Sequence, residues 1–284
     1  MMRKRLFPVA AATMFCLLAS AQEVSTGGLT YTLDSETLTA TLSAFTKAPA
    51  DSILSISETV TDSTDMKTYT VTAIGEGAFR VRAAYRNEIL ALRKIVVPKT
   101  VTTIGKRAFW ITQTKWTQEG SVCSLDSLVF AEGSQLREIG EQAFYMNEVD
   151  LPEGLQTIGR GVFNGNDRLT HVGIPSTVDS IAPQAFSGAT KLQAVTLPEG
   201  LRVVADSAFM NVPLDHPTIP ASVERIGALA FSRTSYVKMA GSVPPAIQSN
   251  TFLAGGTVEV PLDAIDTYAQ ADVWKDLNLT GGTF

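Results

Sequence analysis

Residues 169–209 contain the same apolar pattern twice. The first copy runs from Leu169 to Phe186 and the second from Leu192 to Phe209, so that each apolar position recurs 23 residues later. A fixed period of this size is typical of a solenoid, in which each repeat is one coil that cannot bury its apolar face alone. The pattern therefore predicts a stack of coils that share one continuous core.

Each coil carries an Ile-Gly-x-x-Ala-Phe element, or a variant of it, and most coils add a strand element of the form apolar-x-apolar-Pro, such as Val172-x-Ile174-Pro175. Alternation turns the apolar pair inward, and the proline ends the strand because it cannot donate to a sheet ladder. We expect a parallel sheet with strands around residues 95, 129, 150, 173, 196 and 219. The glycine after Ile predicts a turn with unusual φ, while the Ala-Phe segment fits either a short helical turn or a strand. The repeated aromatic residues, which we expect to be buried, are Phe79, Phe109, Phe144, Phe163, Phe186, Phe209 and Phe231, with a weaker copy at Phe252.

The two ends of the chain differ from the repeats. Residues 1–21 combine a basic start at 3–5, an apolar run over 6–18 and small residues at 19–21, which is typical of a secretory signal. Alternating segments at 29–33 and 38–42 predict a hairpin. We therefore divide the chain into a signal peptide (1–21), an N-terminal β cap (22–72), a solenoid (73–257) and a C-terminal cap (258–284).

The cysteines and the apolar runs bear on location. The apolar run of the signal is shorter than the roughly 20 residues that span a bilayer, so we expect no transmembrane segment after cleavage. Lipidation at Cys16 is disfavoured because Phe15 stands where a small residue is expected. The mature chain would keep only Cys123, which leaves no internal disulfide framework. The expectation is an exported protein, either secreted or held at the cell surface.

The pattern I-P-x-x-V-x-x-I-G-x-x-A-F, which covers roughly Val71–Phe252, resembles the leucine-rich repeats of BspA-like bacterial surface proteins. The tail, with Tyr268 and Trp274, looks like the closing segment of that family. The resemblance implies a curved right-handed solenoid, mostly β with short helical or irregular turns. It also implies export and a role in binding rather than catalysis, since some relatives are described as adhesins for host matrix proteins. The shared motif is structural, so it carries over no binding residues.

Two long insertions and a charge asymmetry mark a candidate binding surface. The link from Phe to the next strand takes 9 residues in the regular coils but 16 after Phe79, 19 after Phe109 and only 5 after Phe144. Residues 80–115 hold nine basic side chains and one acid, whereas the chain after residue 21 has 20 Lys+Arg against 28 Asp+Glu, a net charge of −8. Insertions in solenoids often form the binding face, and Arg and Trp are enriched at binding hot spots. The candidate residues are Arg80, Arg82, Tyr85, Arg86, Trp110, Lys115 and Trp116.

The sequence offers little for catalysis, metals or cofactors. It has no G-x-S-x-G, no phosphate-binding glycine loop and no H-E-x-x-H. His171 and His216 fall at the same outward position of coils two rungs apart, roughly 9–10 Å from the ladder spacing, which is too far to share a metal. Glu148 should lie beside His171. We therefore expect no cofactor and no catalytic residue.

Three functions stay open. The first is a non-catalytic, adhesin-like module that binds a protein, possibly an acidic one. The second is a carbohydrate-binding or sulfated-glycan-binding surface protein, and the third is an exported hydrolase on a repeat scaffold. Nucleic acid fits the basic window but not the exported compartment, and the sequence does not specify an oligomeric state.

Overall fold

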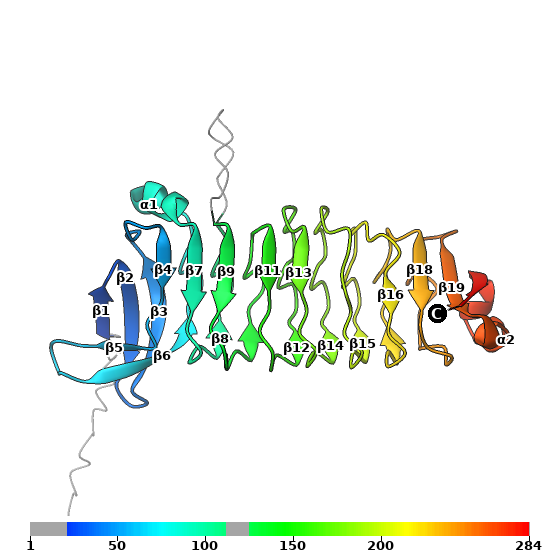
Figure 1. The fold of residues 1–284 in the computed structure, drawn as a ribbon, viewed down its shortest axis with the longest axis horizontal. Coiled ribbons are helices and arrows are strands. Elements are labelled where there is room, and N and C mark those ends of the chain that lie inside the picture. Colours follow the sequence, from blue (N-terminus) through cyan, green and yellow to red (C-terminus); the bar gives the residue numbers. More distant parts are fainter. Residues whose placement is uncertain (1–21, 112–124, 284) are drawn as a thin grey trace, which may run out of the picture.

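The computed structural model describes residues 22–111 and 125–283, which form one elongated stack of coils (Figure 1). Its N-terminal end is antiparallel: β1 (Gln22–Thr26) pairs with β2 (Leu29–Asp34), and β2 pairs with β3 (Thr39–Phe45). β5 (Thr59–Thr61) pairs antiparallel with β6 (Thr68–Ile74), which also lies parallel to β3. These strands are therefore joined by hydrogen bonds to the coils that follow.

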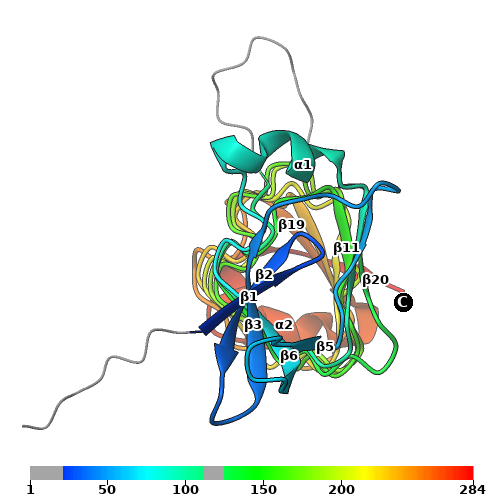
Figure 2. The same ribbon diagram turned by 90° about the vertical axis from the view of Figure 1, so that its left-hand side faces the viewer.

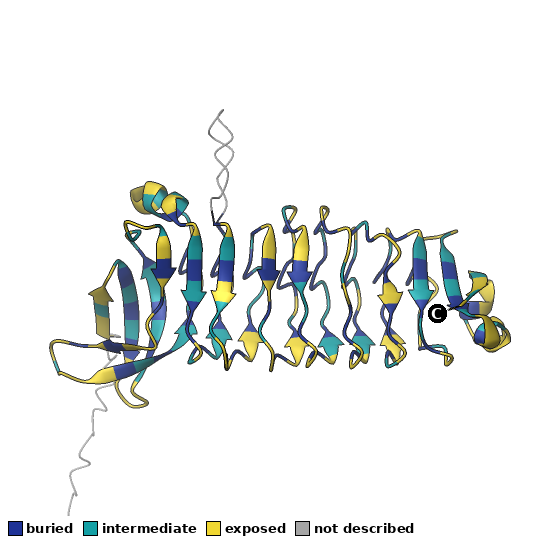
Figure 3. Cartoon of the chain, viewed as in Figure 1, coloured by how far each residue is buried: buried dark blue, intermediate teal, exposed yellow. Residues whose placement is uncertain are grey.

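One side of the stack carries the strands that the apolar-x-apolar pattern predicts. They form three parallel groups rather than one sheet. The first group is β4 (Ile53–Ser55), β7 (Lys94–Val97) and β9 (Ser127–Phe130); the second is β11 (Glu148–Asp150) and β13 (His171–Gly173); the third is β16 (Thr218–Ile219), β18 (Tyr236–Met239), β19 (Thr257–Pro261) and β20 (Asn278–Gly282). We call this side the sheet face. Along it, buried and exposed residues alternate (Figure 3).

The strand predicted around residue 196 is wrong, because residues 194–197 form no regular strand. In the next coil the residue that aligns with Val195 is Pro217, which has no N–H to donate across the ladder. The neighbouring His216 also has φ of +48°, which turns its backbone out of the extended conformation. The sheet face is therefore interrupted between β13 and β16.

A second parallel ladder, which the sequence did not predict, runs through the Ile of each Ile-Gly element. Its strands are only two residues long, since the turn that follows begins at once. They are β8 (Thr103–Ile104) and β10 (Glu138–Ile139), which continue from β6, and then β12 (Thr157–Ile158), β14 (Ser180–Ile181), β15 (Val203–Val204) and β17 (Arg225–Ile226).

The Ala-Phe segments are turns, and their phenylalanines stack along the core. Consecutive ring centroids from Phe45 to Phe252 lie 4.9 to 6.1 Å apart. The seven rings from Phe79 to Phe231 have no exposed surface, which confirms the predicted burial. We call this column of rings and turns the Phe spine. Seen end-on, the coils superpose on one another (Figure 2).

The predicted role of the glycine after Ile is wrong. None of these glycines has positive φ; they lie instead where two coils approach closely. A Cβ on Gly105 would lie 2.7 Å from the amide nitrogen of Glu76, and one on Gly140 would lie 2.5 Å from that of Lys106. Only glycine fits at these two positions, because any side chain would collide with the backbone of the neighbouring coil.

The left-handed backbone sits two residues later, directly before Ala-Phe. All seven coils have φ between +53° and +61° at this position. Its amide donates to a carbonyl of the next coil, as Gln184 does to Asp206 (3.1 Å) and Ser207 to Ala228 (2.7 Å). The left-handed residues are Gly77, Arg107, Gln142, Gly161, Gln184, Ser207 and Leu229.

Short helices lie outside the ladders. The first insertion folds into the 3-10 turn η1 (Ala83–Tyr85) and helix α1 (Arg86–Ala91), which packs at one edge of the stack through Ile89 (Figures 1 and 2). At the C-terminal end lie η2 (Leu262–Ala264), α2 (Ile265–Gln270) and η3 (Trp274–Asp276). There Trp274 covers Phe252, at 5.8 Å between ring centroids, and its Nε1 donates to the Pro245 carbonyl. In the part of the chain described here, no helix has the length and apolar run needed to cross a bilayer.

Candidate functional site

The structure places five of the seven candidate residues on two neighbouring coils; Lys115 and Trp116 lie outside the described residues. Arg80 follows Phe79 of the spine, and Arg82 directly precedes η1. Tyr85 ends η1 and Arg86 begins α1. Trp110 occupies in the next coil the position that Arg80 occupies in the first. Four of the five thus come from the first insertion and its start, and one from the turn beside it.

Arg80 and Arg82 meet a third arginine that the sequence did not single out. This is Arg107. The three arginines and Glu76 line a depression of about 600 Å³. No other described residue forms a hydrogen bond or ion pair with the side chain of Arg80 or Arg82. Two free guanidinium groups beside a third one suit an anion, because guanidinium donates in a planar fork to carboxylate, sulfate or phosphate. Tyr85 and Arg86 do not line this depression.

Trp110 extends this surface along the stack. Its ring lies 4.9 Å from that of Tyr145 at an angle of 45°, and the Arg107 guanidinium lies 5.9 Å from the Trp110 ring centroid. Arg107 Nε also donates to Gln142 Oε1 (2.8 Å), and the Tyr145 hydroxyl donates to Asp167 (2.6 Å). Trp110 and Tyr145 are each partly exposed. We call Arg80, Arg82, Arg107, Trp110 and Tyr145 the basic edge.

The prediction missed Arg107 and Tyr145 for one reason. Both lie in the turns of the Phe spine, where the repeat pattern suggested only structure. For Tyr145 a signal was nevertheless present, since the residue after the spine Phe is Arg80, Trp110 and Tyr145 in three consecutive coils. Reading that column across the coils, rather than along the insertions, would have found Tyr145 but not Arg107, which lies outside it.

One charged pair lies in the turns beside the basic edge. Lys106 Nζ lies 2.8 Å from Glu141 Oε2, and this hydrogen bond is the main cause of a lowered pKa of the Glu141 carboxyl, with smaller effects from Arg160 and Arg107. Because Glu141 is satisfied by Lys106, it does not neutralise the depression one coil away. The depression thus holds three guanidinium groups, Arg80, Arg82 and Arg107, against the one carboxylate of Glu76, so its net charge is positive.

The sheet face holds the two histidines, both exposed. Glu148 and His171 are paired in register, as predicted, and His171 Nε2 lies 3.2 Å from Asp150 Oδ1. His216 contacts Asp215, and its ring lies 4.6 Å from that of Tyr236. Among the described residues no group of histidine, cysteine and acidic side chains could hold a metal ion.

One polar cluster near the C-terminal end bears on the hydrolase alternative. The Tyr236 hydroxyl donates to Glu259 (2.6 Å), and Lys238 Nζ lies 3.4 Å from the same carboxylate. The hydrogen bond raises the pKa of Tyr236 and lowers that of Glu259. The tyrosine therefore stays protonated and the glutamate ionised, a combination that holds β18 to β19 and is poorly suited to proton transfer near neutral pH.

Comparison with known proteins identifies the repeat. Residues 120–238 match the BspA type leucine-rich repeat region in six copies. The crystal structure of the T. pallidum leucine-rich repeat protein is 22% identical with a TM-score of 0.53, over 75% of this chain and 89% of that one. A leucine-rich cell surface protein from Faecalibacterium prausnitzii A2-165 is 18% identical with a TM-score of 0.46, over 93% of this chain and 96% of that one. The pneumococcal vaccine antigen PcpA is 15% identical with a TM-score of 0.45, over 93% and 99%. No curated protein matches the chain.

Proposed function

We propose that this protein, in which residues 120–238 match BspA type leucine-rich repeats, is an exported or cell-surface module that binds another macromolecule without catalysis. The observation that carries the proposal is the basic edge. There Arg80 and Arg82 lack partners among the described residues and lie beside Arg107 in one depression. The partner is an acidic protein surface that enters this depression and covers Trp110.

The aromatic pair supports a second candidate, a sulfated glycan. Trp110 and Tyr145 present two partly exposed rings next to the arginines. Sugar rings pack on such aromatic surfaces while guanidinium groups bind sulfate oxygens. The two candidates differ in how much they depend on the rings.

A paired binding measurement tests the proposal. The probes are dextran sulfate, polyglutamate and neutral dextran, with affinity followed at several salt concentrations. The double variant Arg80→Ser/Arg82→Ser should lose affinity for both anionic probes, and binding by the wild type should weaken as salt rises. Arg225→Ser/Arg233→Ser, which removes the same charge from exposed sites several coils away, is the matched control. Equal affinity in the two double variants contradicts the proposed site.

Trp110→Ala separates the two partner classes. Loss of dextran sulfate binding with retained polyglutamate binding favours the glycan. Equal loss of both favours a protein partner that packs on the ring. Wild-type binding of both probes in this variant removes Trp110 from the site.

Export is tested on the N-terminus. The signal pattern over 1–21 predicts that the mature protein begins at Gln22, which is the first residue of β1. Mass spectrometry of the secreted or surface fraction should give that N-terminus. Full-length protein confined to the cytoplasm contradicts the proposed location.

A further inference from the structure

Both ladders of the solenoid break at the same place. β9 pairs with β7 and β11 pairs with β13, but within residues 22–111 and 125–283 no backbone hydrogen bond joins β9 to β11, although they lie side by side (Figure 1). In the second ladder β10 pairs with β8 and β12 with β14, again without a bond between β10 and β12. The Phe spine crosses this junction, since the Gln142 amide donates to the Gly161 carbonyl (2.8 Å).

The break lies next to an unusually short link. Five residues lead from Phe144 to Val149, whereas nine lead from Phe163 to Val172 in a regular coil. The short link leads directly into β11, so the break coincides with a local change in coil length.

Backbone groups of both strands face the opening. The amides of Ser127 and Ala131 donate to carbonyls of β7 and its flank, at 3.1 and 2.9 Å. Successive residues of a parallel strand bond to opposite sides, so the amides of Leu128 and Phe130 face β11. Directly after β11 the amide of Leu151 donates to the Gly173 carbonyl, away from β9, so by the same alternation the amide of Asp150 faces β9.

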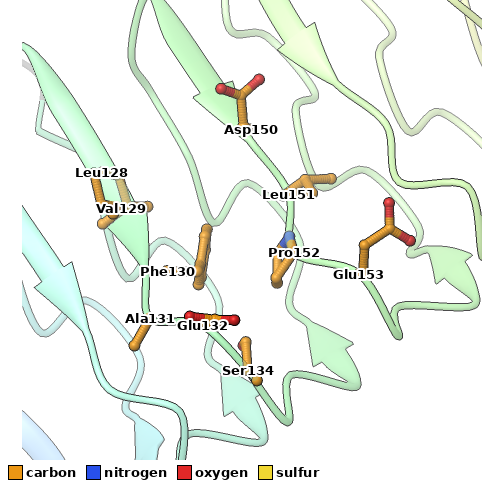
Figure 4. A pocket seen from close by; sticks show the side chains of 11 residues that line it. Leu128, Val129, Phe130, Ala131, Glu132, Ser134, Asp150, Leu151, Pro152 and Glu153 are labelled. Atoms are coloured by element: carbon orange, nitrogen blue, oxygen red, sulfur yellow. The ribbon is translucent and has the colours of Figure 1, made fainter.

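The opening is a cleft of about 460 Å³ with apolar walls. Leu128, Val129 and Phe130 form one wall, and Leu151 and Pro152 the other (Figure 4). Phe130 is partly exposed here, although the corresponding Val97 is 1% exposed and the corresponding Ile219 has no exposed surface. The cleft thus presents apolar surface that the coils of Val97 and Ile219 bury.

Carboxylates surround these walls. Figure 4 shows Phe130 and Pro152 between the carboxylates of Asp150 and Glu132, and Glu153 also lines the cleft. Glu153 is held in place by the Ser176 amide (3.2 Å) and hydroxyl (3.0 Å). Of the described residues that line the cleft, none is Lys or Arg. Its charge is therefore negative, opposite to that of the basic edge.

We propose that this cleft binds a lysine or arginine side chain from a basic segment of a partner protein. The aliphatic stem of such a side chain packs on apolar walls while its charged end stays polar. Glu132 accepts charge-assisted hydrogen bonds from that end, and the Phe130 ring offers a cation–π contact. Asp150, whose Oδ1 lies 3.2 Å from His171 Nε2, adds negative charge to the rim of the cleft. The site uses no residue of the basic edge, so the inference goes beyond the proposed function and does not depend on it.

The test uses the mature chain and a fluorescent peptide of four Lys-Ser repeats, with binding followed by anisotropy at low salt. Val129→Trp fills the cleft and leaves every carboxylate in place, while Glu132→Gln removes one charge and leaves the walls intact. Each should weaken binding by about tenfold, the worth of one charge-assisted contact. Val243→Trp and Glu23→Gln make the same changes at exposed positions far from the cleft and should stay within about twofold of the wild type.

Each other outcome overturns the proposal. Wild-type affinity in Val129→Trp means that the peptide binds only to general negative charge, and no measurable wild-type binding removes basic segments as the occupant. If Val129→Trp unfolds at a lower temperature than the wild type, the test rests on Glu132→Gln alone, which is a conservative change at an exposed residue. Self-association of the wild type that Glu132→Gln abolishes in sedimentation makes a second copy the occupant instead. Arg80→Ser/Arg82→Ser should bind the peptide at least as tightly as the wild type, which separates this test from that of the basic edge.

Discussion

The Phe spine and the sheet face belong to the same coils but respond differently to changes in coil length. From Phe45 to Phe252 the rings stack without a gap, whereas the sheet face is interrupted between β9 and β11 and again between β13 and β16. The spine is built from the contiguous Ile-Gly-x-x-Ala-Phe element, so its geometry is set locally. The strands follow links of 5 to 19 residues and take their register from those lengths.

The difference separates stability from binding. A column whose every ring is buried gives each coil a fixed contact with its neighbours, as expected for a quasi-one-dimensional fold. The sheet face and the insertions can then open or vary without loss of the stack. Both candidate binding surfaces, the basic edge and the cleft, lie where link lengths depart from the regular nine residues.

The largest effect should come from the middle of the spine. Phe186→Ala removes a ring stacked between Phe163 and Phe209, at 5.0 and 4.9 Å, and should lower the free energy of unfolding by about 3–5 kcal/mol. Denaturant unfolding measures it. Lys191→Ala, at an exposed turn, should change stability by less than about 0.5 kcal/mol. Equal losses in the two variants would mean that the spine does not carry the stability.

The close approach of coils should give the next largest effect. Gly140→Ala places a Cβ 2.5 Å from the Lys106 nitrogen and 2.8 Å from the Gly105 carbonyl carbon, so neighbouring backbone must shift. We expect a loss of about 1–3 kcal/mol, the usual cost of overpacking. Gly200→Ala is the control, since its Cβ would meet nothing nearer than 3.7 Å. If Gly140→Ala and Gly200→Ala unfold at the same temperature, the coils do not approach as closely at Gly140 as the structure shows.

A glycine at the left-handed position should stabilise the spine slightly. Leu229 has φ of +57° and a side chain that is 38% exposed, so Leu229→Gly relieves an unfavourable conformation and loses little burial. The relief of about 1–2 kcal/mol is partly offset by the greater freedom of glycine in the unfolded chain, which leaves about 0.5 kcal/mol. Lys191→Gly, at a residue without positive φ, should destabilise instead. A thermal melt in which both glycines destabilise contradicts the assigned conformation.

The smallest effect should be on the sheet face and should depend on pH. The hydrogen bond from Tyr236 lowers the pKa of Glu259 below its usual 4.5. A lowered folded-state pKa adds stability above the usual value, and this stability is lost as pH falls through the folded-state pKa. In urea unfolding, the stability difference between wild type and Tyr236→Phe should therefore shrink from neutral pH to about pH 3. A difference that is constant or grows would mean that Glu259 is not the partner that matters.

Much of this contrast could be predicted from the sequence, because the repeat is local. The repeat period correctly predicted which phenylalanines are buried and which positions of β7, β11 and β13 point inward. Aligning the coils also correctly predicted that Glu148 lies beside His171. The role of the glycine after Ile was misread, since close approach of two coils and positive φ both favour glycine and only coordinates distinguish them. The short link after Phe144 was visible as a count. The loss of pairing between β9 and β11 beside it is a relation between two coils, which the count alone does not show.

The candidate site, too, was predicted only in part. Arg80, Arg82 and Trp110 could be found from composition and insertion length. Tyr145 needed the column after each spine Phe to be compared across coils, and Arg107 could not be found, because it joins the surface through its contact with the Trp110 ring. The cleft has no sequence motif at all, since its walls are ordinary core residues that a missing hydrogen-bond ladder leaves open.

Residue-resolved hydrogen exchange tests the central claim, a continuous spine beside an open sheet face. The amides of Phe163 and Phe186, which donate to the next coil at 2.8 Å, should exchange only when the stack unfolds. Those of Leu128 and Phe130, which face the cleft, should exchange at least about 100-fold faster than that of Val129, whose amide faces β7. Equal protection of Leu128, Val129 and Phe130 would show that β9 and β11 are paired and that there is no cleft.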